Sequence, residues 1–327
     1  MTKNNESPRP SDIGGRCGAT KDRQVSVLSF LEEQIDFLTD CRRLGTAMNY
    51  RRAASALSGF LDGRELRFEE LDSRLVERYR DYLLHRGLVR NSLSFHMRIL
   101  RAVYNKAVRC GHAGQTFPFR NVYTGIDRTR KRAVGEEVIA RLIRLDLSAR
   151  PTLDFARDLF LFSFYTRGMA FVDLAYLRRN DIRDGILRYV RRKTGQELYV
   201  RIEPCIAAII GRYAAANPDS PYLFPLLADE NPADSFRRYK SALRTYNARL
   251  SELSRLLGLP QRLSSYTSRH SWATMARNHH VPLSVISAGM GHASEKTTQI
   301  YFASLDNSLI VNANKELLET FGESASA

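Results

Sequence analysis

The chain is 327 residues long, carries a formal net charge of +15 and consists of 43% apolar residues. That length can bury two hydrophobic cores, and so much apolar sequence places the positive charge on a folded protein rather than on a disordered tail. A globular protein this basic most often binds a polyanion, with nucleic acid as the first candidate, and charge that serves only solubility is the alternative.

Cysteine usage and hydropathy exclude several further classes. Cys17, Cys41, Cys110 and Cys205 are far apart and form no C-x-x-C pair, which argues against a disulfide framework or a zinc site. The first residues lack the apolar core of a signal peptide, and no apolar run is long enough to span a bilayer. We therefore expect a soluble, cytoplasmic protein with no membrane partner.

The first half of the chain predicts a helical module. Residues 1–22 are rich in Ser, Pro, Gly and Asn and are predicted to form a disordered leader. Within residues 23–112, apolar residues repeat at helical spacing in four segments, which we expect to pack together as four helices. Gly45 is predicted to end the first helix, and Thr46 and Asp72 to cap the second and third.

The outward face of the fourth predicted helix indicates a partner. It carries cations and small polar groups, namely Arg90, Asn91, Ser94, Arg98 and Arg101. Such a stripe suits contacts with DNA phosphates and groove edges, whereas a solvated helix face is the alternative, and the net charge favours DNA. Residues 113–133 lose the helical periodicity and predict a basic linker that could follow a nucleic-acid backbone.

Residues 134–327 predict a second, mainly helical domain with a small antiparallel sheet. The alternating segments 186–190 and 198–202 flank Lys193-Thr-Gly195-Gln and predict a β-hairpin. Helical patterns cover residues 136–145, 152–165, 171–177, 206–215, 235–256, 268–277 and 283–290, and a short helix bearing Tyr301 follows. The amphipathic segment 309–318 could dock on a neighbouring protomer or fold back on its own domain.

A cation, an imidazole and a phenol occur together near the C-terminus. Arg269-His270 opens a predicted helix, Gly291-His292 forms a turn, and Tyr301 closes the stretch. A fold could bring these groups to one anion, for which phosphate is the obvious choice because a guanidinium matches two of its oxygens. The histidine spacing matches no zinc pattern, so we expect no metal.

Together these motifs resemble the tyrosine recombinase, or phage integrase, family. The matching pieces are Arg269-His270, Met290-Gly291-His292, the Thr-Thr-Gln-Ile-Tyr301 run, and the hairpin lysine Lys193. Residues 23–112 resemble the family's helical core-binding (SAM-like) domain, and residues 134–327 its catalytic domain. The resemblance implies a mainly α fold with a small antiparallel sheet, and an integrase of a mobile element or a DNA invertase.

Two positions depart from the family pattern. Tyr266 stands where the family usually has histidine, and tyrosine can donate a hydrogen bond but cannot carry a positive charge. Ala170 stands where the family's first arginine belongs, while Arg167 lies one helical turn earlier and could present its side chain on a similar face. We predict that Arg167 substitutes for that arginine, and further candidates are Arg178, Arg179 and Arg191.

In the mechanism that the resemblance implies, Tyr301 attacks a DNA phosphate, forms a 3′-phosphotyrosyl bond and frees a 5′-hydroxyl. Arg269 and Arg167 would hold the non-bridging oxygens, and His292 would add a hydrogen bond. Lys193 would protonate the leaving oxygen. No cofactor is expected, because the protein linkage keeps the energy of the phosphoester bond for religation.

Supporting residues and partners follow from the same resemblance. Tyr266 would orient the phosphate, while His270 and Asp173 are expected to be structural supports, with Asp173 anchoring an arginine. The implied partner is double-stranded DNA with specific recombination sites, bound by a tetramer with a possible accessory DNA-bending protein. Two alternatives stay open: a protein of this fold that binds DNA without catalysis, and a metal-dependent nuclease. No motif distinguishes integration, excision and inversion.

Overall fold

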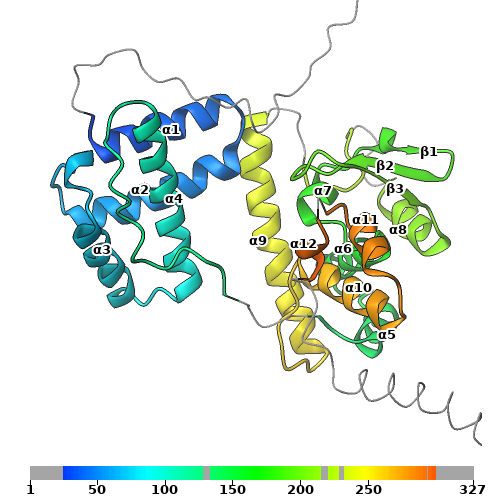
Figure 1. The fold of residues 1–327 in the computed structure, drawn as a ribbon. Coiled ribbons are helices and arrows are strands. Elements are labelled where there is room, and N and C mark those ends of the chain that lie inside the picture. The colour runs from blue at the N-terminus through cyan, green and yellow to red at the C-terminus, as the bar shows by residue number, and fades with distance from the viewer. Residues whose placement is uncertain (1–24, 128–132, 215–219, 228–231, 293, 300–327) are drawn as a thin grey trace, which may run out of the picture. The chain divides into compact units, whose positions relative to one another are not determined.

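The computed structural model describes residues 25–127, 133–214, 220–227, 232–292 and 294–299. The chain forms two compact units, Met1–Arg128 and Thr129–Ala327 (Figure 1). No helix in these ranges is both long and apolar enough to cross a membrane. Tyr301, residues 309–318 and the predicted leader lie outside the described residues.

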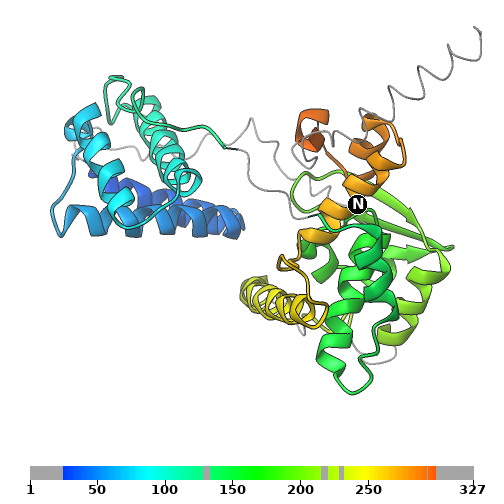
Figure 2. The same ribbon diagram turned by 90° about the horizontal axis from the view of Figure 1, so that it is seen from below.

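The first unit contains the predicted four-helix module. Its helices are α1 (Val27–Asp40), α2 (Leu44–Leu61), α3 (Ser73–His85) and α4 (Arg90–Arg109), with a short 3-10 turn η1 (Phe68–Glu70) between α2 and α3. The apolar stripes of the helices meet in one core that includes Leu31, Leu57, Tyr79, Met97 and Tyr104. Figure 2 shows α1 and α2 lying side by side beneath α4. Phe119 and Val122, which were expected in the linker, are buried in the same core.

One helix boundary was predicted correctly and one was not. Asp72 caps α3, because its Oδ1 accepts a hydrogen bond from the backbone N–H of Leu75 at 2.7 Å. The predictions that Gly45 ends a helix and Thr46 starts the next were wrong, since both residues lie inside α2. The chain reverses at Arg42 instead, whose left-handed backbone (φ 55°) makes the turn without a glycine.

The second unit is built around α6 (Pro151–Tyr165), which is buried along much of its length and packs against α5, α8, α9 and α10. The core includes Phe160, Phe162, Leu174, Phe224 and Leu250. The remaining helices are α5 (Glu136–Arg144), α7 (Phe171–Ala175), η2 (Arg179–Asp181), α8 (Pro204–Ala214), α9 (Pro232–Leu256), α10 (Thr267–Asn278), α11 (Leu283–Gly289) and α12 (Glu295–Gln299).

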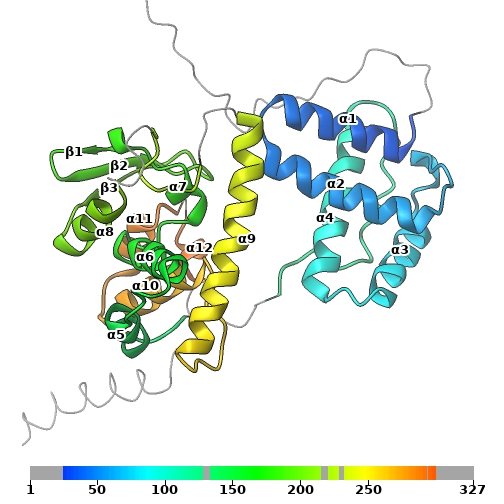
Figure 3. The same cartoon turned by 180° about the vertical axis from the view of Figure 1, so that it is seen from behind.

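A three-stranded antiparallel sheet lies beside α8 (Figure 3). Its order is β1 (Ile182–Arg183), β2 (Ile186–Val190) and β3 (Glu197–Arg201). Leu187 pairs with Val200 and Tyr189 with Leu198, and all four side chains are buried. The predicted hairpin is therefore confirmed, whereas β1, only two residues long, was not predicted.

Candidate active site

Arg269 is the centre of the candidate site. It lies in the first turn of α10 and is only 2% exposed. Its Nη1 donates to the carbonyl of Gly168 at 2.6 Å, and its Nη2 donates to the carbonyl of Met290 at 2.6 Å. The guanidinium thus ties the loop before α7 to the end of α11.

Gly168 is required by the close approach of that loop to α10. Its backbone is left-handed (φ 73°), and a Cβ at this position would lie 2.6 Å from Cα of Arg269. Any side chain here would have to displace the backbone of α10, because the atom that it meets is not part of a flexible side chain. Glycine therefore sets the position of Arg269.

Arg191 brings a second buried guanidinium to the same place. It follows β2 directly, is 4% exposed, and donates from Nη1 to the carbonyl of Gly291. Arg269 and Arg191 thus hydrogen-bond to the carbonyls of consecutive residues, Met290 and Gly291. Two buried cations in one place repel each other, and the charges of both act on the buried carboxyl of Asp173.

The sequence contained a signal for Arg191 that the motif search did not use. Leu187 and Tyr189 face the core, and the two-residue period of the strand places Arg191 on that same side. Gly291 allows the approach, since a Cβ there would lie 3.2 Å from Cδ of Arg191. The arginine beside Gly291 is therefore Arg191, which the sequence offered only as a further candidate after Arg167.

His292 contacts Arg269 directly and is itself buried. Its Nε2 lies 2.8 Å from Nη2 of Arg269, and its Nδ1 lies 2.7 Å from Oγ1 of Thr298. A guanidinium only donates, so Nε2 must be the acceptor and the N–H of the neutral ring must sit on Nδ1. Burial, and then the charges of Arg269, Arg191 and Lys193, lower the pKa of His292 to about 4. In this arrangement His292 orients Arg269 and has no N–H left to offer a phosphate.

Lys193, in the hairpin, and Asp173, on α7, lie beside this cluster. Lys193 is exposed at the hairpin tip, in a turn closed by a hydrogen bond from Gly195 N–H to the carbonyl of Arg191 at 2.8 Å. Asp173 is 4% exposed and accepts a hydrogen bond from the backbone N–H of Arg192 at 2.9 Å. Burial raises the pKa of Asp173 against the lowering effect of that hydrogen bond and the nearby arginines. Asp173 therefore anchors the base of the hairpin through its backbone.

The other predicted site residues differ in how far their side chains are buried. Arg167 has a left-handed backbone (φ 61°), is half-buried, and sends its Cδ to 3.4 Å from where a Cβ would stand at Gly289. Tyr266 precedes α10, is 45% exposed, and has its ring 6.1 Å from that of His270. Arg178 and Arg179 lie at η2, where the guanidinium of Arg178 is 5.9 Å from the ring centre of Tyr222.

In the first unit, the predicted DNA-binding face carries a segment of its own chain. Ser94 is fully buried and donates to the carbonyl of Gly125 at 2.5 Å. Asn91 exchanges two hydrogen bonds with the backbone of Asp127, at 3.1 and 2.8 Å. Contact between DNA and these two side chains would require residues 125–127 to leave α4.

The cations of that face are more accessible. The side chain of Arg90 is 65% exposed, with its guanidinium 4.0 Å from the ring centre of Tyr123 and 3.5 Å from Asp127. Arg101 is exposed and donates to Oγ1 of Thr124 at 2.9 Å. Arg98 is half-buried, and its Nε has no hydrogen-bond partner among the described residues. The basic stripe is therefore present, but residues 123–127 of the same unit lie along it.

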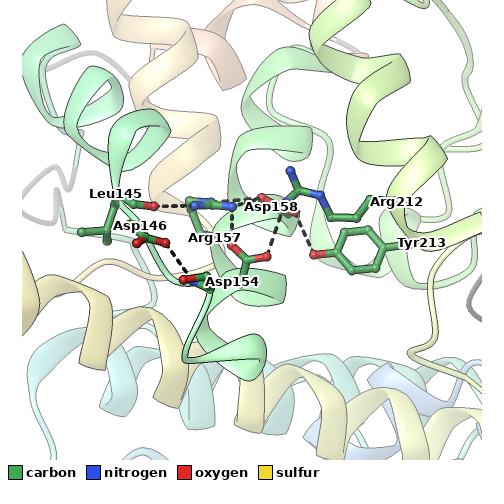
Figure 4. Close-up of polar contacts among 8 residues, drawn as sticks. Leu145, Asp146, Asp154, Arg157, Asp158, Arg212 and Tyr213 are labelled. Atoms are coloured by element: carbon green, nitrogen blue, oxygen red, sulfur yellow. Dashed lines mark hydrogen bonds and ion pairs between the residues drawn. The ribbon is translucent and has the colours of Figure 1, made fainter.

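Another arginine cluster of the second unit has balanced charge (Figure 4). Arg157 lies between Asp154 and Asp158, with its Nε 3.0 Å from Oδ1 of Asp158. Arg212 reaches Oδ2 of Asp158 at 2.5 Å, and the Tyr213 hydroxyl donates to the same oxygen at 2.8 Å. Two cations thus face two carboxylates, as expected for a structural network. Within the described ranges, no group of three or more His, Cys, Asp or Glu side chains could hold a metal ion.

Comparisons with known proteins agree along most of the chain. The profile of the phage integrase SAM-like domain matches residues 26–121, and that of the phage integrase family matches residues 136–308. Tyrosine recombinase XerD of Pseudomonas aeruginosa is 23% identical over 265 residues, which cover 77% of this chain and 84% of XerD.

Solved structures are similar in fold. A lambda integrase tetramer bound to a Holliday junction has a TM-score of 0.61 at 14% identity, covering 86% of this chain and 78% of that one. The Tn1549 transposon integrase in complex with transposon right end DNA has a TM-score of 0.63 at 12% identity, covering 90% of this chain and 100% of that one. At these identities the likeness concerns the fold.

Proposed function

This chain belongs to the phage integrase family and is a site-specific tyrosine recombinase, and we propose that it cuts and rejoins DNA through a 3′-phosphotyrosyl bond at Tyr301. The observation that supports this chemistry most is the meeting of Arg269 and Arg191 at the consecutive carbonyls of Met290 and Gly291. A phosphodiester placed beside these guanidinium groups would relieve their mutual repulsion and accept bidentate hydrogen bonds.

The arginines would stabilise the transition state of phosphoryl transfer. Negative charge builds on the non-bridging oxygens during attack, and one well-placed donor to such an oxygen is worth about 3 kcal/mol. We assign the role of the missing first arginine to Arg191, because it is as deeply buried as Arg269 and bonds to the next carbonyl. Arg167, which is half-buried, remains the predicted second contact at the edge of the site.

The nucleophile and the general acid would come from the sequence that follows α12 and from the hairpin. A phenol has a pKa of about 10, so Tyr301 needs nearby cations to attack at neutral pH. Its phenolic oxygen gives up its proton to water and forms the bond to phosphorus as the bond to the 5′-oxygen breaks, and Lys193 gives that 5′-oxygen a proton. Religation reverses these steps, so that no external energy source enters the cycle. Tyr266, at the start of α10, would contact the phosphate from its exposed side.

DNA is the partner, and the first unit would add contacts to the backbone. We propose Arg90 and Arg101 as phosphate contacts because their side chains are exposed. Asn91 and Ser94 would support them by holding residues 125–127 on α4. The lambda integrase tetramer on a Holliday junction supports a tetramer on DNA for this chain as well. An accessory DNA-bending protein and the outcome of recombination stay predictions of the family resemblance.

The test is covalent capture of DNA. Nicked duplexes that tile the DNA flanking the coding region are incubated with the protein in EDTA, and adducts are separated on denaturing gels. The expected result is a protein–DNA adduct with the wild type and none with Tyr301→Phe. Binding without an adduct would favour the binding protein, and cutting that EDTA abolishes would favour the nuclease.

The same assay distinguishes the arginines. Arg191→Ala is expected to abolish the adduct, whereas Arg167→Ala is expected to reduce its yield. Ala170→Arg, which restores the family residue, is the matched gain-of-function variant and is expected to rescue Arg191→Ala in part. Full activity of Arg191→Ala with loss in Arg167→Ala would return the role to Arg167.

A further inference from the structure

A chain of buried hydrogen bonds joins Arg269 to the helix that leads to Tyr301. Nη2 of Arg269 donates to Nε2 of His292 at 2.8 Å, and Nδ1–H of His292 donates to Oγ1 of Thr298 at 2.7 Å. The three residues are 2%, 7% and 0% exposed. Thr298 lies on α12 (Glu295–Gln299), and Tyr301 follows shortly after that helix ends.

Thr298 differs from its neighbour in environment. Thr297 is exposed, and its Oγ1 lies 3.3 Å from Oγ of Ser294 in the same turn of chain. The hydroxyl of Thr298 instead points inward to the imidazole. α12 spans only Glu295–Gln299 and packs on α11. Because so short a helix is not stable by itself, we expect the buried hydrogen bond of Thr298 to contribute much to holding α12 in place.

The hydroxyl also decides which nitrogen of His292 carries the proton. With Oγ1 as acceptor, the proton sits on Nδ1 and Nε2 is free to accept from Arg269. Without that acceptor, a buried Nδ1–H would be left unsatisfied, and the ring would turn to find another partner. Nε2 would then leave Nη2 of Arg269, and the guanidinium would lose its orienting bond.

We propose that Thr298 is a positioning residue, which acts through His292 to hold Arg269 and the end of α12, two residues before Tyr301 in the sequence, in one mutual arrangement. The role rests on the proposed function, since it serves the same phosphate site. It places the cation that binds the phosphate and the phenol that attacks it under the control of one hydroxyl. The positioning of Arg269 for phosphate binding and the positioning of Tyr301 for attack are thereby coupled.

The first test reads the tautomer without any DNA. Protein labelled with 15N-histidine is examined by NMR, and the pattern of couplings assigns the protonated nitrogen of His292. Wild type, Thr298→Ser and the exposed control Thr297→Val are expected to show an Nδ1–H that is protected from exchange with water, and Thr298→Val to lose that protection. An equally protected Nδ1–H in a folded Thr298→Val protein overturns the proposal.

The second test measures chemistry apart from binding. Thr298→Val is expected to slow single-turnover adduct formation by about 10- to 100-fold with DNA affinity unchanged, as for a displaced catalytic group. Thr298→Ser should restore the rate, and Thr297→Val should leave it unaltered. Equal losses in Thr297→Val and Thr298→Val, or loss of DNA affinity alone, overturn the proposal. If wild type forms no adduct, the proposed function fails, while the NMR result still decides the role of Thr298.

Discussion

Replacing Gly168 by alanine tests whether the loop before α7 sets the position of Arg269. The new Cβ would lie 2.6 Å from Cα and 2.8 Å from Cγ of Arg269, at a backbone φ of 73°. A left-handed backbone costs a non-glycine residue about 1–2 kcal/mol. The overlap, which only a backbone shift relieves, adds about 1–3 kcal/mol. We therefore expect Gly168→Ala to lower the free energy of unfolding by about 2–5 kcal/mol.

Gly185→Ala is the matched control for this substitution. Its φ is 72°, but a Cβ there would meet nothing within 4 Å, so only the backbone cost of about 1–2 kcal/mol applies. Urea denaturation gives the difference between the two variants, and adduct formation on nicked DNA gives the catalytic effect. Gly168→Ala should also slow cleavage by about 100-fold, because Arg269 is displaced from its carbonyl partner. Equal stability and equal cleavage in the two variants would refute the reasoning.

Four shorter predictions concern charge. Because the pKa of His292 is about 4 in the folded protein, acidification from pH 6.5 towards 4 protonates the unfolded chain preferentially and lowers stability, and melts of His292→Gln should depend less on pH over that window. Lys193→Ala should slow cleavage by about 10²- to 10⁴-fold, and by much less on DNA with a 5′-bridging sulfur, a leaving group that needs no proton. With six to ten phosphate contacts, titrations should show affinity falling by about three to five decades between 50 and 200 mM salt. Arg157→Ala should cost about 1.5–3 kcal/mol in urea denaturation, because the buried Asp158 loses one guanidinium partner but keeps Arg212 and the Tyr213 hydroxyl, while cleavage per folded molecule stays unchanged.

Local patterns in the sequence predicted most elements of the fold. The helical periodicity of apolar residues identified α1 to α4, and the turn around Gly195 identified the hairpin. These signals lie within short stretches of chain, and burial of the apolar side makes them reliable. The boundary at Gly45 failed because a single non-glycine residue, Arg42, adopts the left-handed conformation that glycine would have supplied.

The residues of the candidate site could be predicted where a sequence motif contains them. They could not be predicted where their position depends on packing between distant parts of the chain. Arg269 and His292 were identified from their spacing, and the structure brings them to 2.8 Å. Ser94 was assigned to an outward face because the segment that covers it, near Gly125, is distant in sequence and has no period to reveal it. Arg191 was only a further candidate because the sequence comparison favoured Arg167, which lies three residues before Ala170. It did not consider that Arg191 follows β2 on the buried side of the strand.

The two buried arginine clusters of the catalytic unit show why position alone does not make an active site. Arg157 is neutralised by Asp154 and Asp158, so its cluster is complete without a ligand (Figure 4). Arg269 donates to two carbonyls and a neutral imidazole, none of which carries a negative charge. A second guanidinium, from Arg191, lies at the next carbonyl. Main-chain carbonyls thus hold Arg269 and Arg191 in place, whereas carboxylates hold Arg157, and the charges of Arg269 and Arg191 also act on the buried carboxyl of Asp173. We therefore expect a phosphate to bind beside Arg269 and Arg191 and not at the Arg157 cluster.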